Sequence, residues 1–386
     1  MNIKGVSAKS IADTRGEKTI SVSIKTSVGN FEASAPNGKS KGKYEAKSYK
    51  KTLQGDIKTL KKIFDYFDEI EIEEFSDLIE VEEICEKQIG ANTLFALESA
   101  VLKALAKEQE KEIFQLINTK PRVIPEFIQN VVGGGQHSHI SGKMKRPDFQ
   151  EFLLISDNPT RNLEAYEELR TILKKKDKEF KSEKNDENAW KTQLNEKQIL
   201  DILTNMREIY KFQIGVDVAA STFYARKKYQ YENPKLTRSV EEQRDYMKSL
   251  INNTSLFYIE DPFEENDFDN FSELKTSFPG VLIVGDDLTV TNPGRMEKAI
   301  EFGSIKGIIV KPNQIGSLLK VKKVVDMAKE HKIKVIFSHR SGETSESILA
   351  DLAVGFEADY IKCSIGGKGR DEKIKRVLQI KEMVGK

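Results

Sequence analysis

The chain has 386 residues, of which 32% are charged and 38% are hydrophobic, and its formal net charge is +1. This length is too great for one small domain and leaves room for a barrel of about 250 residues plus a further domain. The balanced charge gives no general attraction to nucleic acid or to membrane surfaces, so any anion site has to be local.

Cysteine usage and the amino terminus bear on the cellular compartment. Cys85 and Cys363 lie far apart and form neither a CxxC motif nor a Cys/His array, which argues against a disulfide scaffold and a structural zinc. The first residues contain no apolar signal-peptide core, and no run of about 18 apolar residues occurs. We therefore expect a soluble cytoplasmic protein that binds neither nucleic acid nor membranes.

The amino-terminal part changes from strand-like to helix-like patterns. Residues 2–35 alternate apolar and polar side chains and predict three antiparallel strands. Residues 36–44, PNGKSKGKY, lack periodicity and are typical of a mobile polar loop. Helical spacing then runs from residue 53 to residue 111. We predict an α+β domain over residues 1–122 and a second domain over residues 123–386.

A glycine-rich segment opens the second domain. Residues 130–140 read NVVGGGQHSHI, and the three glycines allow the backbone to approach a ligand closely. His137 and His139 would share one face of an extended segment, which leaves metal chelation open, although no third ligand lies nearby.

The next stretch contains a strand candidate and two helical segments. The strand candidate, PDFQEFLLIS, carries Gln150 and Glu151. Residues 161–213 are charged and mostly helical. An interruption around Glu187 and Trp190 divides them, and we expect most of it to be a solvated connection.

Six apolar runs between residues 215 and 362 each carry a reactive or charged residue at or near the carboxyl end. These residues are Asp217, Glu260, Asp286, Lys311, His339 and Lys362. They are 43, 26, 25, 28 and 23 residues apart, taking differences between successive numbers. A period near 25 fits a strand, a turn and a helix, so the pattern predicts a (β/α) barrel whose strand ends converge on one mouth. For any one of the six, an ordinary solvated loop position remains the alternative.

Three of these residues are carboxylates on successive predicted strands. Asp217, Glu260 and Asp286 would offer an all-oxygen site, and hard oxygen ligands without cysteine or histidine favour Mg²⁺. Structural salt bridges from the carboxylates to Lys311 or Lys362 are the alternative.

The remaining groups suggest acid–base chemistry. Lys311 lies in an apolar run, and bound divalent cations facing it in a partly dry site would lower the pKa of its ammonium and make it a usable base. His339, Arg340 and Ser341 lie together in SHRSGET, a combination suited to a phosphate. A metal, a lysine base and an anion site together indicate proton abstraction next to a carboxylate, with stabilisation of the enolate.

These motifs resemble a known family. GVDVAAS, YIEDPF, VGDDLTVTNP, KPNQIG, SHRSGET and ADYIK closely resemble enolase, the phosphopyruvate hydratase of glycolysis and gluconeogenesis. SAKSIADTRGEKTISVSI, GKYEA, GANTLFA and NVVGGGQH follow the same family order, so the resemblance covers nearly the whole chain. It implies a modified TIM-type (β/α)8 barrel, irregular in its first units and preceded by an α+β capping domain.

The resemblance also implies an activity, which is the Mg²⁺-dependent, reversible dehydration of 2-phosphoglycerate to phosphoenolpyruvate. Lys311 would take the C2 proton, Glu187 would help the C3 hydroxyl leave, and Glu151 would support that acid. One Mg²⁺ would be held by Asp217, Glu260 and Asp286, and a second would be completed by substrate and Ser40. The residues implied to line or contact the substrate are His137, Gln150, His339, Arg340, Ser341 and Lys362. The family further implies a homo-oligomer built from dimers.

The chain departs from the family pattern in three places. The closing loop, usually SGAST, reads NGKSK at residues 37–41, and the acid segment, usually GDEGG, reads NDENA at residues 185–189. After Lys362, CSIGGKG replaces the usual TGAP. The chain is also shorter than a typical member, with the loss expected around residues 160–195. A paralogue that acts on a different hydroxy acid, and a non-catalytic binding protein, are the alternatives.

Overall fold

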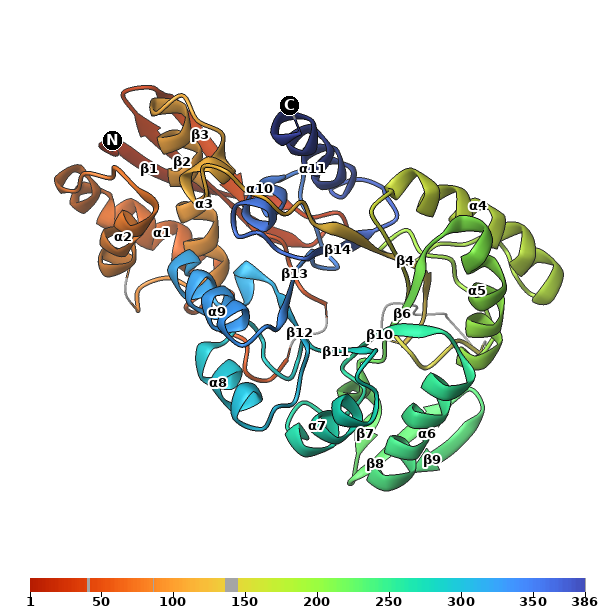
Figure 1. Ribbon diagram of the computed structural model, residues 1–386. Coiled ribbons are helices and arrows are strands. Elements are labelled where there is room, and N and C mark those ends of the chain that lie inside the picture. The colour runs from red at the N-terminus through yellow and green to blue at the C-terminus, as the bar shows by residue number, and fades with distance from the viewer. Residues whose placement is uncertain (40–41, 86, 136–144, 386) are drawn as a thin grey trace.

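The computed structural model describes residues 1–39, 42–85, 87–135 and 145–385. Figure 1 shows an α+β unit, formed by the amino-terminal part of the chain, lying against one side of a barrel surrounded by helices. None of the helices in the described part of the chain is long and apolar enough to span a membrane.

The amino-terminal unit begins with the predicted antiparallel meander. Strands β1 (Gly5–Ala12), β2 (Lys18–Thr26) and β3 (Gly29–Ser34) pair in that order. Alternation along β2 buries Ile20, Val22 and Ile24 on one face, as expected for a sheet with one covered side. The helices of the unit are α1 (Leu53–Ile63), α2 (Leu78–Cys85) and α3 (Ala91–Glu108), of which α3 packs on β2 and β3.

The second part of the chain is a closed barrel of eight strands among the described residues. The strands are β4 (Glu126–Gly133), β5 (Glu151–Ser156), β6 (Gln213–Asp217), β10 (Leu256–Glu260), β11 (Leu282–Gly285), β12 (Gly307–Val310), β13 (Lys334–Ser338) and β14 (Tyr360–Ser364). β5 runs antiparallel to both of its neighbours, β4 and β6, whereas all other neighbouring pairs are parallel. The prediction of a barrel with irregular first units is therefore confirmed.

Helices surround the barrel (Figure 1). They are α4 (Pro159–Lys176), α5 (Glu196–Tyr210), α6 (Val240–Asn253), α7 (Phe268–Ser277), α8 (Pro293–Glu301), α9 (Leu318–Glu330), α10 (Ile348–Gly355) and α11 (Asp371–Val384). Inside the barrel, an apolar cluster includes Tyr258, Val284 and Ile309. Because side chains alternate along a strand, the residue two positions after each of these faces the same interior. Those residues are Glu260, Asp286 and Lys311.

Two elements were missed by the sequence analysis. Residues 130–133, which we interpreted as part of a flexible glycine-rich segment, belong to the barrel strand β4. A small meander of β7 (Tyr224–Ala225), β8 (Lys228–Glu232) and β9 (Lys235–Arg238) lies between β6 and α6. This insertion explains why Asp217 and Glu260 are 43 residues apart whereas the later units repeat every 23 to 28 residues.

The amino-terminal unit contacts the barrel beside Lys311. Asn313 Nδ2 donates to Asn92 Oδ1 and to the Pro36 carbonyl, both at 3.0 Å. Gly316 follows in the same turn with φ +85°, and a Cβ added there would lie 2.6 Å from the Cα of Ala91, the first residue of α3. Only glycine therefore allows α3 to approach this turn so closely.

Gly316→Ala is expected to reduce the free energy of unfolding by about 2–3 kcal/mol, because the added methyl both meets backbone atoms and disfavours the positive φ. Urea unfolding followed by circular dichroism measures this change. Gly280→Ala is the matched control, since Gly280 has ordinary φ and no described atom lies within 4 Å of its added Cβ. An equal effect of the two substitutions would contradict this account.

Candidate active site

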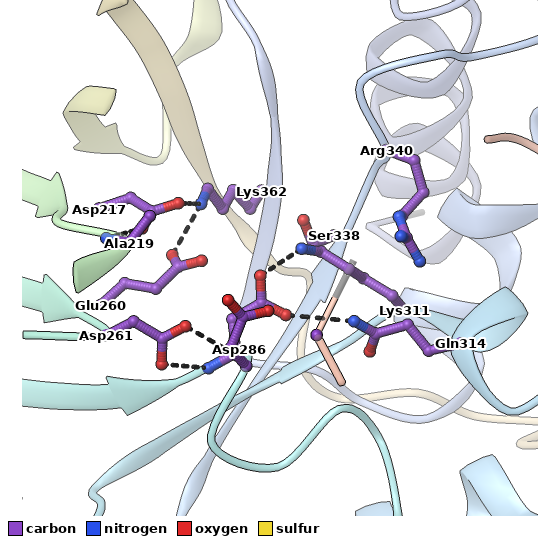
Figure 2. Close-up of polar contacts among 12 residues, drawn as sticks. Asp217, Ala219, Glu260, Asp261, Asp286, Lys311, Gln314, Ser338, Arg340 and Lys362 are labelled. Atoms are coloured by element: carbon purple, nitrogen blue, oxygen red, sulfur yellow. Dashed lines mark hydrogen bonds and ion pairs between the residues drawn. The ribbon is translucent and has the colours of Figure 1, made fainter. Parts of the chain in front are cut away.

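The barrel brings the six predicted strand-end residues to one mouth. Asp217 and Glu260 end β6 and β10, Asp286, Lys311 and His339 directly follow β11, β12 and β13, and Lys362 lies within β14. Figure 2 shows the carboxylates and the two lysines pointing toward one another. All six are largely buried, so the alternative of ordinary solvated loop positions is excluded.

Lys362 is the centre of a buried charge cluster. Its Nζ lies 2.7 Å from Glu260 Oε2, 2.9 Å from Glu151 Oε2 and 3.1 Å from Asp217 Oδ2. Because β5 runs in reverse, its first residue, Glu151, pairs in register with Asp217 at the end of β6. Burial opposes the charge on Lys362, but the three carboxylates together raise its pKa well above the ordinary value.

Lys311 forms an ion pair with Asp286. Burial lowers the pKa of Lys311, but attraction to Asp286 outweighs it and leaves the pKa above its ordinary value. The lowered pKa expected from the sequence concerns a lysine that faces bound divalent cations, so it stays a prediction, whereas pairing with Asp286 alone raises the pKa. The salt bridges that we weighed as an alternative to a metal site are thus present for both lysines.

A second group of acidic side chains lies beside this ion pair. One carboxylate oxygen from each of Asp261, Asp286 and Asp287 lies within 4.8 Å of the other two. The Asp261 carboxylate accepts the backbone N–H groups of Asp286 at 3.0 Å and Asp287 at 2.7 Å. Burial and repulsion by Asp286 raise the pKa of Asp287 to about 8. Asp261 and Asp287 were missed, although each directly follows a predicted ligand in the sequence.

The carboxylates fit a hard cation. Glu260 Oε1 is buried and has no hydrogen-bond partner within the described part of the chain. Burial and repulsion by Asp217 raise the pKa of Glu260 well above its ordinary value, although Lys362 opposes this shift. An oxygen atom without a partner and a surplus of buried negative charge are what an oxygen-liganded divalent cation would satisfy. The predicted ligands do not form one compact group, however, since Asp217 and Glu260 gather around Lys362 whereas Asp286 lies with Asp261 and Asp287.

Much of the segment that carries Glu187 is buried or half-buried, which corrects our expectation of a mostly solvated connection. Glu187 is 2% exposed, and its Oε2 accepts a hydrogen bond of 3.0 Å from Asn130 Nδ2 of β4. Trp190 stacks on Tyr166 with ring centroids 4.6 Å apart. Its backbone N–H donates to the carbonyl of Val131 at 3.0 Å, so the segment is fixed along β4.

Asn185, Asn188 and Ala189 stand where the family pattern GDEGG has glycine. Asn185 Oδ1 accepts the backbone N–H groups of Glu187 and Ala189, both at 3.0 Å. Asn188 has φ +65°, a left-handed conformation that asparagine adopts more readily than most residues other than glycine. The turn around Glu187 therefore forms without glycine.

His339 faces Glu187. Its Nε2 lies 3.9 Å from Glu187 Oε1, and Arg370 Nε donates to its Nδ1 at 3.3 Å. Burial and the charge of Arg370 hold the pKa of His339 well below the ordinary value despite the nearby Glu187. A neutral ring whose Nδ1 accepts a hydrogen bond carries its proton on Nε2, toward Glu187.

The predicted phosphate residues are held by other groups of the chain. Arg340 Nη2 lies 3.0 and 3.1 Å from the two carboxylate oxygens of Glu45, and Nη1 donates to Asn313 Oδ1 at 3.3 Å. Ser341 Oγ accepts the Lys39 backbone N–H at 2.8 Å and Arg15 Nη1 at 3.0 Å. Glu45 and Arg15 had no predicted role, although they lie in the motifs GKYEA and SAKSIADTRGEKTISVSI.

Gln150 completes the described part of the predicted site. Its Nε2 donates to Asp217 Oδ2 at 3.3 Å, and its Oε1 is buried without a hydrogen-bond partner among the described residues. Ser40, His137 and His139 lie outside the residues that the structure describes.

The chain matches family models over almost its whole length. The model described as Enolase, N-terminal domain, matches residues 3–117, and the model described as Enolase, C-terminal TIM barrel domain, matches residues 121–386.

Curated relatives agree with this match. A protein named Enolase from Pyrobaculum aerophilum is 35% identical over an alignment that covers 100% of this chain and 98% of the relative. That alignment spans 418 positions, more than the 386 residues of this chain, so the relative has residues without a counterpart here. Proteins named Enolase from Methanosphaera stadtmanae and Sulfurisphaera tokodaii are 34% and 35% identical, over 98% and 99% of this chain and 97% and 96% of the relatives. With both family models matched and the barrel formed, the chain belongs to the enolase family.

Proposed function

We propose that the chain is a phosphopyruvate hydratase, a carbon–oxygen lyase that interconverts 2-phosphoglycerate and phosphoenolpyruvate in glycolysis and gluconeogenesis. The observation that carries this proposal is one barrel mouth that holds a buried lysine next to an acidic cluster and a buried glutamate next to a neutral histidine. A base and an acid in different electrostatic surroundings are what an elimination needs.

The carboxylates would hold the metal. Asp217, Glu260 and Asp286 would bind one Mg²⁺, and Ser40 with substrate would complete a second site. When bound, Mg²⁺ supplies positive charge that favours the carboxylate of the substrate and the enolate formed from it.

Lys311 takes the proton from C2. The ion pair with Asp286 keeps the ammonium of Lys311 charged. Lys311 would become a base only when the Asp286 carboxylate binds a different cation. Burial then lowers its pKa and favours the neutral amine.

Glu187 acts on the other reacting carbon. Its carboxyl group protonates the departing C3 hydroxyl while Asn130 and His339 hold it in place, and Glu151 supports this acid. Arg340 and Ser341 bind the phosphate, Gln150 and Lys362 contact the carboxylate end, and His137 and His339 line the pocket.

Lys311→Ala is expected to reduce the Mg²⁺-dependent formation of phosphoenolpyruvate by about 10²–10⁴-fold, because the reaction loses its base. Ultraviolet absorbance of the product follows the reaction. Lys322→Ala, which changes an exposed lysine of α9, is the control and should retain activity. If the unaltered chain produces no absorbance change at high substrate and Mg²⁺, the proposed function is wrong.

Glu187→Gln is expected to separate the two halves of the reaction. Dehydration should fall by about 10²–10⁴-fold, whereas exchange of the C2 proton in deuterated water should continue because Lys311 is intact. Proton magnetic resonance of 2-phosphoglycerate measures the exchange, and Lys311→Ala should abolish it. Equal losses of exchange and dehydration in Glu187→Gln would contradict the role of Glu187 as the acid.

The alternatives have their own experimental signatures. A paralogue for another substrate would exchange the proton next to the carboxylate of a different 2-hydroxy or 3-hydroxy acid. A non-catalytic binding protein would retain its partner in a pull-down after substitution of Asp217, Glu260 and Asp286. Retention of Lys311 and of these carboxylates favours the enzyme.

Cytoplasmic location and assembly from dimers stay predictions, as does the domain division at residues 122 and 123. Size-exclusion chromatography with light scattering tests the assembly.

A further inference from the structure

Lys39 connects two places where the chain departs from its family pattern. Its Nζ lies 3.0 Å from Asp186 Oδ2, and Asp186 directly precedes Glu187. The lysine belongs to the altered NGKSK stretch, and the aspartate belongs to the altered NDENA stretch. The two departures therefore meet in space, although 147 residues separate them.

The backbone around Lys39 is fixed on the opposite side. The Lys39 N–H donates to Ser341 Oγ at 2.8 Å, and Asn37 exchanges two backbone hydrogen bonds with Gly342, of 2.7 and 2.9 Å. Gly38 lies against Arg340 so closely that an added Cβ would be 1.8 Å from its Nη2. Residues 37–39 are thus pinned to the turn at residues 340–342, and the side chain of Lys39 extends from there to Asp186.

We propose that Lys39 is a positioning residue that ties the Glu187 segment to the turn carrying Arg340 and Ser341. This inference rests on the proposed function, because it concerns the acid of that reaction. Asn185 and Asn130 hold Glu187 from within its own segment and from β4. Lys39 adds a contact from the amino-terminal unit. The same short segment, residues 37–39, therefore contacts both the Glu187 segment and the turn that carries Arg340 and Ser341.

The strength of this link is limited by exposure. The side chains of Lys39 and Asp186 are 26% and 38% exposed, so the ion pair is partly screened by water and salt. We therefore expect a severalfold effect on the acid step that decreases with ionic strength. Because the base and the metal ligands are elsewhere in the mouth, proton exchange at C2 should not depend on Lys39.

Lys39→Met tests the proposal, with Lys43→Met as the matched control. Lys43 lies in the same predicted loop, residues 36–44, and pairs with Glu265 rather than with Asp186. In Lys39→Met, kcat for dehydration should fall about threefold with little change in KM, and the rate of C2 proton exchange should stay the same. The difference in kcat between Lys39→Met and the unaltered chain should become smaller in about 1 M salt. A variant with both charges reversed, K39D/D186K, should recover part of the lost kcat relative to K39D alone.

A second measurement does not require activity. Hydrogen–deuterium exchange of a peptide covering residues 183–190 should be about twofold faster in Lys39→Met than in Lys43→Met. Trp190, the only tryptophan of the chain, should also become more accessible to acrylamide quenching. Faster exchange in a chain without hydratase activity would support the tie while contradicting the proposed function. Identical exchange in the two variants, or equal losses of dehydration and C2 exchange, would overturn the proposal.

Discussion

Buried negative charge at the barrel mouth is the constraint on which the rest of the structure depends. An isolated carboxylate taken out of water costs several kcal/mol, so Glu151, Asp217 and Glu260 can be buried together only because Lys362 lies within about 3 Å of each. Lys311 does the same for Asp286. These pairs leave Glu260 Oε1 without a hydrogen-bond partner among the described residues, and a bound cation would satisfy a buried oxygen of this kind.

The direction of each barrel strand determines which of its residues lies at the mouth. In a fully parallel barrel, every mouth residue would come from the carboxyl end of a strand. Here β5 is reversed, so Gln150 and Glu151 enter the mouth from the start of a strand and meet Asp217. The segment that carries Glu187 then lies along β4, which places Glu187 next to His339. The reversed strand β5 thus lies between β6, which carries Asp217, and β4, which holds the Glu187 segment next to His339.

Much of this arrangement could be predicted from the sequence because the later βα units are regular. The spacing from Glu260 to Lys362 predicted the barrel and its mouth, and the long gap before Glu260 held the unpredicted meander β7–β9. The burial of Glu187 could not be predicted, because it depends on contacts of Trp190 with Tyr166 and with β4 that no local pattern reveals. The pKa of Lys311 likewise depends on Asp286, which lies 25 residues away in sequence.

Because Arg340 already pairs with Glu45, an anion that binds Arg340 would have to replace one ion pair with another. Arg340 is 4% exposed, and a carboxylate of the same chain already accepts from its guanidinium. A phosphate that bound Arg340 would therefore not add an ion pair to an open site but would compete with a tethered anion whose effective concentration is fixed by the fold. The affinity of such a phosphate would reflect the difference in stability between two ion pairs, so a weakly charged anion would compete poorly with Glu45.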